Sequence, residues 1–161
     1  METIDLVCIA LWTVGIFLFK FSYQGNQAYK LVAEQSQDFL NSSYSMLESG
    51  EIDDSSEESK FLNAFSNSML QSTILFFCQI ALSLYILVTM PKGLIYYLAA
   101  FTLYSIIISF GLSYSYKKAT GEINIFKLVR NFPKWLRSYD RISQSISGIV
   151  FIALAILVFM Q

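Results

Sequence analysis

The chain has 161 residues, of which 55% are hydrophobic and only 14% are charged, and 14 of them are phenylalanine. A soluble domain carries roughly 25% charged residues, so this composition argues against a soluble protein and indicates one membrane domain with lipid as its solvent. The net charge of −1 argues against a nucleic-acid partner, and the absence of histidine removes the commonest metal ligand and general base.

Residues 4–21 form the first apolar run and are predicted to span the membrane, with Asp5 and Lys20 near its two surfaces. No basic region precedes the run and no small-x-small site follows it. We therefore expect an anchor with a translocated N-terminal tail rather than a cleaved signal peptide.

Residues 23–70 are the extended polar region, and their apolar spacing predicts a helical hairpin whose arms continue the first and second spans. The first arm covers about 24–47, and a capping box of Ser55 and Glu58 is expected to open the second. The second arm carries apolar residues at steps of four, namely Phe61, Phe65 and Met69. Between the arms lies an acidic turn, ESGEIDDSSEES. The alternative is a disordered acidic loop, although such loops do not space apolar residues in this way.

Residues 74–90 and 94–116 are predicted to be the second and third spans, joined by the short turn 91–93. A Pro-Lys-Gly turn is short enough to force two antiparallel neighbours. Small residues at steps of four allow helices to approach closely in lipid, and polar side chains hydrogen-bond across them. The expected helix–helix contact residues are therefore Ser105, Ser109, Ser113 and Gln79.

Residues 117–141 are predicted to be a basic amphipathic interfacial helix, followed by the fourth span at 142–160. One stripe is expected to contact anionic lipid or an acidic partner: Lys127, Arg130, Lys134, Arg137 and Arg141. The opposite face carries the expected interfacial anchor: Phe132, Trp135 and Leu136. Alternatively, the apolar face packs on the hairpin or on a partner protein, or the helix is a nucleic-acid or calmodulin-like site. Pro133 should kink or break the helix near Phe132.

The distribution of lysine and arginine predicts the orientation in the membrane. Ten of these residues lie in or beside the two larger loops, and only Lys92 lies on the other side. The larger loops are therefore expected to be cytoplasmic and both termini outside, in a plasma or bacterial inner membrane. The hairpin is acidic and the segment 117–141 is basic, so we expect the two to lean on each other or to meet a partner.

The sequence offers little for catalysis. No span carries a charged residue near its middle, and there is no phosphate-binding glycine loop and no nucleophile elbow. Cys8 and Cys78 lie in apolar stretches at different depths, so we expect two small buried hydrophobic residues rather than a disulfide.

These features predict an all-α, four-span membrane protein without a cofactor and without enzymatic activity. The favoured function is a membrane interaction protein, acting either as an accessory or assembly subunit or as an immunity or exclusion protein. Its expected partners are anionic membrane lipids and either another protein or further copies of the chain. The alternatives are a homo-oligomeric ion channel and, less favoured, an enzyme acting on lipid head groups.

Overall fold

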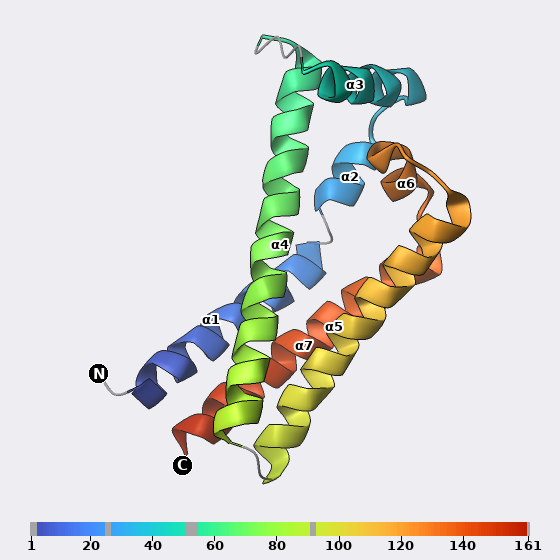
Figure 1. The fold of residues 1–161 in the computed structure, drawn as a ribbon. Helices are drawn as coiled ribbons and strands as arrows, with labels where there is room; N and C mark the ends of the chain where they lie inside the picture. The colour runs from blue at the N-terminus through green and yellow to red at the C-terminus, as the bar shows by residue number, and fades with distance from the viewer. Residues whose placement is uncertain (1–2, 25–26, 51–54, 91–92, 161) are drawn as a thin grey trace.

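The computed structural model describes residues 3–24, 27–50, 55–90 and 93–160, and these residues are almost entirely helical (Figure 1). The helices are α1 (Thr3–Gln24), α2 (Gln27–Ala33), α3 (Gln37–Ser49), α4 (Glu57–Thr89), α5 (Gly93–Thr120), α6 (Ile125–Asn131) and α7 (Lys134–Phe159). The predicted all-α class is confirmed.

Four helices, in the regions of α1, α4, α5 and α7, are long and apolar enough to cross a membrane. Only 17% to 33% of the residues in their most apolar windows are buried within the protein. The remaining apolar surface faces outward. Exposing this surface to water is unfavourable, whereas contact with lipid tails is not. Four candidate spans and an integral, multi-pass membrane protein are therefore supported, as the sequence predicts.

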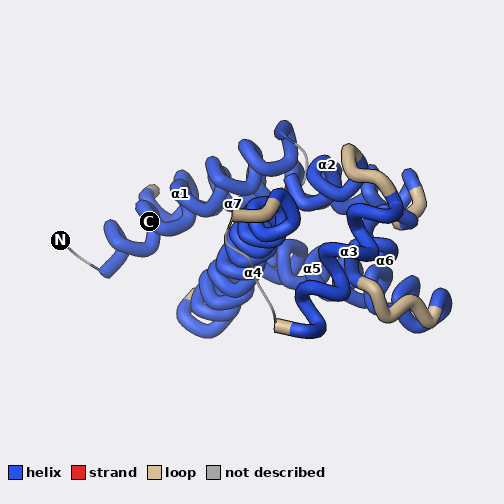
Figure 2. Tube along the Cα trace, turned by 90° about the horizontal axis from the view of Figure 1, so that it is seen from above, coloured by secondary structure: helices blue, strands red, loops and turns tan. Residues whose placement is uncertain are grey.

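The chain runs back and forth, so that the start of α1, the end of α4, the start of α5 and the end of α7 lie at one end (Figure 1). The short helices α2, α3 and α6 lie at the other end, beside the N-terminal part of α4 (Figures 1 and 2). We call α2, α3, α6 and residues 57–71 of α4 the cap. With 33 residues, α4 is about 50 Å long at 1.5 Å per residue, which lets one helix cross a membrane and still reach the cap.

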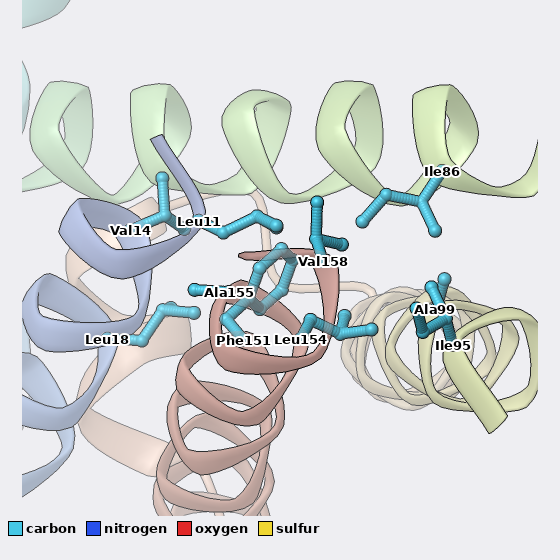
Figure 3. Packing of buried hydrophobic residues seen from close by; sticks show 10 residues of the cluster. All are labelled: Leu11, Val14, Leu18, Ile86, Ile95, Ala99, Phe151, Leu154, Ala155 and Val158. Atoms are coloured by element: carbon cyan, nitrogen blue, oxygen red, sulfur yellow. The ribbon is translucent and has the colours of Figure 1, made fainter. Parts of the chain in front are cut away.

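The core among the candidate spans is built around Phe151 of α7, which is fully buried (Figure 3). Side chains of α1, α4 and α5 surround it: Leu11, Val14, Leu18, Ile86, Ile95 and Ala99. Every span therefore contributes to one apolar centre.

Helices α1 and α7 approach each other closely at Gly15 and Gly148. A Cβ atom added to Gly148 would lie 2.9 Å from the carbonyl oxygen of Gly15 and 3.1 Å from the backbone nitrogen of Phe19. The two backbones are in direct contact, and a small residue is needed on both sides.

The predicted interfacial helix over 117–141 is wrong in its detail. The third span continues as α5 to Thr120, a connection follows, α6 occupies Ile125–Asn131, and a second break separates it from α7. The break coincides with Pro133, as predicted, because proline lacks the N–H that a continuing helix requires. Lys134 begins α7, so the last basic residues belong to the fourth span helix rather than to a separate surface helix.

The first arm of the hairpin is also not one helix. Ser36 interrupts it as the N-cap of α3, where its hydroxyl accepts a hydrogen bond from the Phe39 backbone N–H at 3.2 Å. At the start of α4 the N-cap is Ser56, which accepts from Ser59 N at 3.1 Å, and not Ser55 as predicted. The central part of the acidic turn (51–54) and residues 91–92 of the Pro-Lys-Gly turn lie outside the described residues.

Candidate functional site

The cap has an apolar core of its own, separate from the core among the spans. Phe126 of α6 lies at its centre and is 1% exposed. The centroid of its ring lies 5.0 Å from the ring centroid of Phe65, 5.3 Å from that of Phe61 and 6.4 Å from that of Tyr44. These edge-to-face contacts join α3, α4 and α6. The expected contact between hairpin and basic segment is therefore present, and apolar and aromatic side chains carry it.

Polar contacts at both ends hold α6 in the cap. Asn124 is buried and caps the helix, its side-chain oxygen accepting from Phe126 N at 2.9 Å and Lys127 N at 3.2 Å. At the other end the Tyr116 hydroxyl of α5 donates to the Asn131 carbonyl at 2.7 Å. The short helix is thus fixed to the end of α5 and to the cap core.

The expected interfacial anchor is divided by the structure. Phe132 and Leu136 are 7% and 2% exposed and belong to the cap core, where the Phe132 ring contacts that of Tyr29 at 5.9 Å. Their apolar face packs on the protein's own hairpin, so an anchoring role in lipid does not apply to these two residues. Trp135 is 59% exposed, and its contact with lipid stays a prediction.

The five basic residues are distributed over α6 and α7 instead of forming one continuous stripe. Arg130 donates to the Gln37 side-chain oxygen at 3.1 Å. Arg137 donates from Nε to the Phe132 carbonyl at 2.9 Å, and its guanidinium lies 5.9 Å from the centre of the Tyr29 ring. The remaining residues are Lys127, Lys134 and Arg141, the last of which donates from Nε to the Ser22 carbonyl at 2.7 Å. Contact with anionic lipid or an acidic partner stays a prediction.

Hydroxyl pairs join the candidate spans within one chain. Ser105 of α5 lies 2.5 Å from Ser143 of α7. Two further pairs are Ser83 with Thr102, at 2.7 Å, and Ser22 with Ser145, at 2.6 Å. Because each hydroxyl satisfies another, these helices can hold polar groups in an apolar environment.

A partly open cavity of about 450 Å³ lies among α4, α5 and α7, with α1 at its edge. Of the predicted contact residues, Gln79, Ser109 and Ser113 line it. Asp140 of α7 also lines it, and Ser109 donates to Asp140 Oδ1 at 3.5 Å. The sequence interpretation missed Asp140 because it placed the residue in an extramembrane segment.

Asp140 is the acidic group of this cavity, and neutral side chains surround its carboxylate. Among the described residues, no group of three or more His, Cys, Asp and Glu side chains could hold a metal ion. The neighbours that hydrogen-bond Asp140 are Ser109 and Gln144, whose amide donates to Oδ2 at 3.3 Å. A hydroxyl and an amide orient the carboxylate but supply no positive charge.

In comparisons with known proteins, the chain matches no family model, no curated protein and no solved structure.

Proposed function

We propose that the protein is a non-enzymatic membrane interaction protein, which acts as an accessory or assembly subunit of a membrane complex or as an immunity or exclusion protein. The observation that supports this is the cap, a packed extension from the candidate spans with its own aromatic core. A packed core keeps the cap in one shape. The cap can therefore present a stable surface to a partner, which a mobile linker cannot do.

Charge on the cap supports the same proposal. Exposed acidic residues lie on α3 and at the start of α4, including Asp38, Glu48 and Glu57, while Lys134 is exposed where α7 leaves the cap. The apolar faces of α3 and α6 are used within the core. The outward surface combines these charged residues with a few exposed apolar side chains such as Leu47 and Leu70. The charges give steering and selectivity toward a partner of complementary charge. In this proposal the cap and larger loops are cytoplasmic, both termini are outside, and the membrane is a plasma or bacterial inner membrane.

Extraction of the full chain in mild detergent, followed by native mass spectrometry, tests this function. We expect a complex with a different protein at fixed stoichiometry. Phe126→Ala, which removes the centre of the cap core, should release that protein. The matched control is Phe159→Ala, because Phe159 is 74% exposed near the end of α7, far from the cap. A lone chain, or a complex unaffected by Phe126→Ala, would contradict the proposal.

The cavity favours a second candidate function, the homo-oligomeric channel. Gln79 of α4 and Ser109 and Ser113 of α5 supply polar groups to its lining, as a water-filled path requires. Reconstitution in liposomes should then give ion flux that Ser109→Leu abolishes, and a ring of identical chains should appear in the mass measurement.

A further inference from the structure

The cavity among α4, α5 and α7 lies at the depth of the membrane. Ser109 follows the start of α5 at Gly93 by about 24 Å at 1.5 Å per residue. The hydrocarbon region is about 30 Å thick, so with Gly93 at one surface, Ser109 is still within it. Asp140 accepts a hydrogen bond from the Ser109 hydroxyl, so with this placement it lies within the hydrocarbon region, near the surface on the cap side.

The charge of this cavity is negative and comes from one side chain. Among the described residues that line it, Asp140 is the only one with a formal charge. Of the neighbouring arginines, Arg137 donates to the Phe132 carbonyl and lies over the Tyr29 ring, and Arg141 donates to the Ser22 carbonyl on α1. An acidic residue within a membrane domain, held by neutral groups, is costly and marks a functional site by default.

Aromatic side chains form part of the cavity wall, beside the polar ones. Phe76, Phe77 and Phe110 line it from α4 and α5. The rings of Phe76 and Phe110 approach each other at 6.2 Å across the two helices. Aromatic faces attract organic cations, and they also provide contact for apolar substituents.

Size decides between a bare ion and a larger ligand. The volume of about 450 Å³ falls within the roughly 300–1,000 Å³ of small-molecule sites. A hard metal cation requires six or more oxygen ligands in a compact arrangement, whereas this cavity offers one carboxylate and scattered hydroxyls. An anion would meet the Asp140 carboxylate.

We propose that this cavity is a binding site for an organic cation with an apolar body, such as a substituted ammonium or phosphonium ion. Asp140 supplies the counter-charge, and the phenylalanine side chains hold the apolar body. Ser109 and Gln144 orient the carboxylate. The site goes beyond the proposed interaction function, because it lies among the spans rather than on the cap.

Equilibrium dialysis of the purified full chain in mild detergent, with tetraphenylphosphonium as the probe, tests the proposal. We expect saturable binding of one cation per chain. Tetraphenylborate has the same shape and the opposite charge, and it should neither bind at this site nor compete. Equal binding of the two probes would overturn the proposal, because binding would then depend on apolar contact alone.

Two variants locate the binding. Asp140→Asn keeps the shape of the side chain and removes its charge, and it should weaken tetraphenylphosphonium binding by about tenfold or more. The matched control is Asp38→Asn, which removes one charge from the exposed surface of α3 and should leave the affinity unchanged. If Asp140→Asn does not fold, Ser113→Leu narrows the cavity without touching the carboxylate and should also reduce binding. Wild-type affinity in both cavity variants would refute the site.

The cation can come from solution or from a lipid head group, and competition distinguishes the two. Displacement of the probe by lysophosphatidylethanolamine, but not by lysophosphatidylglycerol, identifies an ammonium head group as the ligand. No displacement by either lipid identifies a small amphipathic cation. Equal displacement by both lipids would contradict charge recognition and overturn the proposal.

Discussion

The contact between α1 and α7 at Gly15 and Gly148 makes a sharp prediction for Gly148→Ala. The added methyl group would lie 2.9 Å from the Gly15 carbonyl oxygen and 3.1 Å from Phe19 N. Both neighbours are backbone atoms, which cannot rotate away as a side chain can. Relief therefore requires the two helices to separate, and that disturbs the core around Phe151.

Two opposing effects set the size of the change. Overpacking a well-packed site costs about 1–3 kcal/mol, while replacing glycine by alanine inside a helix gains about 0.5–1 kcal/mol. Gly111 provides the matched control, since it lies within α5 and a Cβ there meets nothing within 4 Å. Both substitutions gain the same stability from replacing glycine inside a helix. The difference between their free energies of unfolding therefore measures the cost of the clash at Gly148. We expect Gly148→Ala to be less stable than Gly111→Ala by about 2 kcal/mol, roughly thirtyfold in the folding equilibrium.

Unfolding by sodium dodecyl sulfate in mixed micelles, followed by tryptophan fluorescence, measures the free energy of unfolding of each variant. The order expected is Gly111→Ala at or above the wild type, and Gly148→Ala below it. Equal stability of the two variants would show that α1 and α7 are not in backbone contact at this point, and the packing described for them would have to be abandoned.

Three further predictions concern the cap and the orientation. Asn124→Ala removes the N-cap of α6 and should lower the stability of this helix by about 1 kcal/mol. Hydrogen exchange should then be faster over 125–131. Exchange at Ser36 and at the start of α3 should stay unchanged. Phe126→Ala should cost about 3–5 kcal/mol within the cap. Limited proteolysis should then cleave α2 and α3 sooner while the spans stay protected, and simultaneous loss of the spans would show that cap and spans form one cooperative unit. A reporter fused to the C-terminus should be active only outside the cytoplasm and one inserted between α3 and α4 only inside it. The reverse pattern would invert the orientation.

The sequence was sufficient to predict features that depend on local chemistry. Long apolar runs indicate spans because lipid leaves few other ways to satisfy the backbone. Pro133 marks the end of a helix wherever it occurs, and α6 and α7 are separated there. The apolar face of the segment 117–141 was also recognised, but a helical wheel does not tell what covers that face. Lipid and protein cores are equally apolar, and Phe132 and Leu136 are covered by the cap.

The features that were missed depend on contacts between distant segments. Ser56 rather than Ser55 caps α4. The N-cap depends on which residue has an extended backbone directly before the first helical turn, and residue type alone does not determine that. The depth of Asp140 depends on α7 beginning at Lys134 and lying against Ser109 of α5. The pairing of Gly15 with Gly148 joins residues from the first and last spans, and no spacing along the chain connects them. A carboxylate near a predicted span end is the signal that would have found Asp140.

One continuous helix, α4, takes part in every region described above. Phe61 and Phe65 lie in the cap core, Phe76 and Gln79 line the cavity, and Ile86 packs in the core among the spans. Because α4 is one uninterrupted helix, a tilt imposed at the cap would also move the residues that line the cavity if the helix stays straight. If the cavity binds a cation and the cap binds a partner, as proposed, such a tilt would couple the two binding events, and each would change the affinity of the other by the same factor.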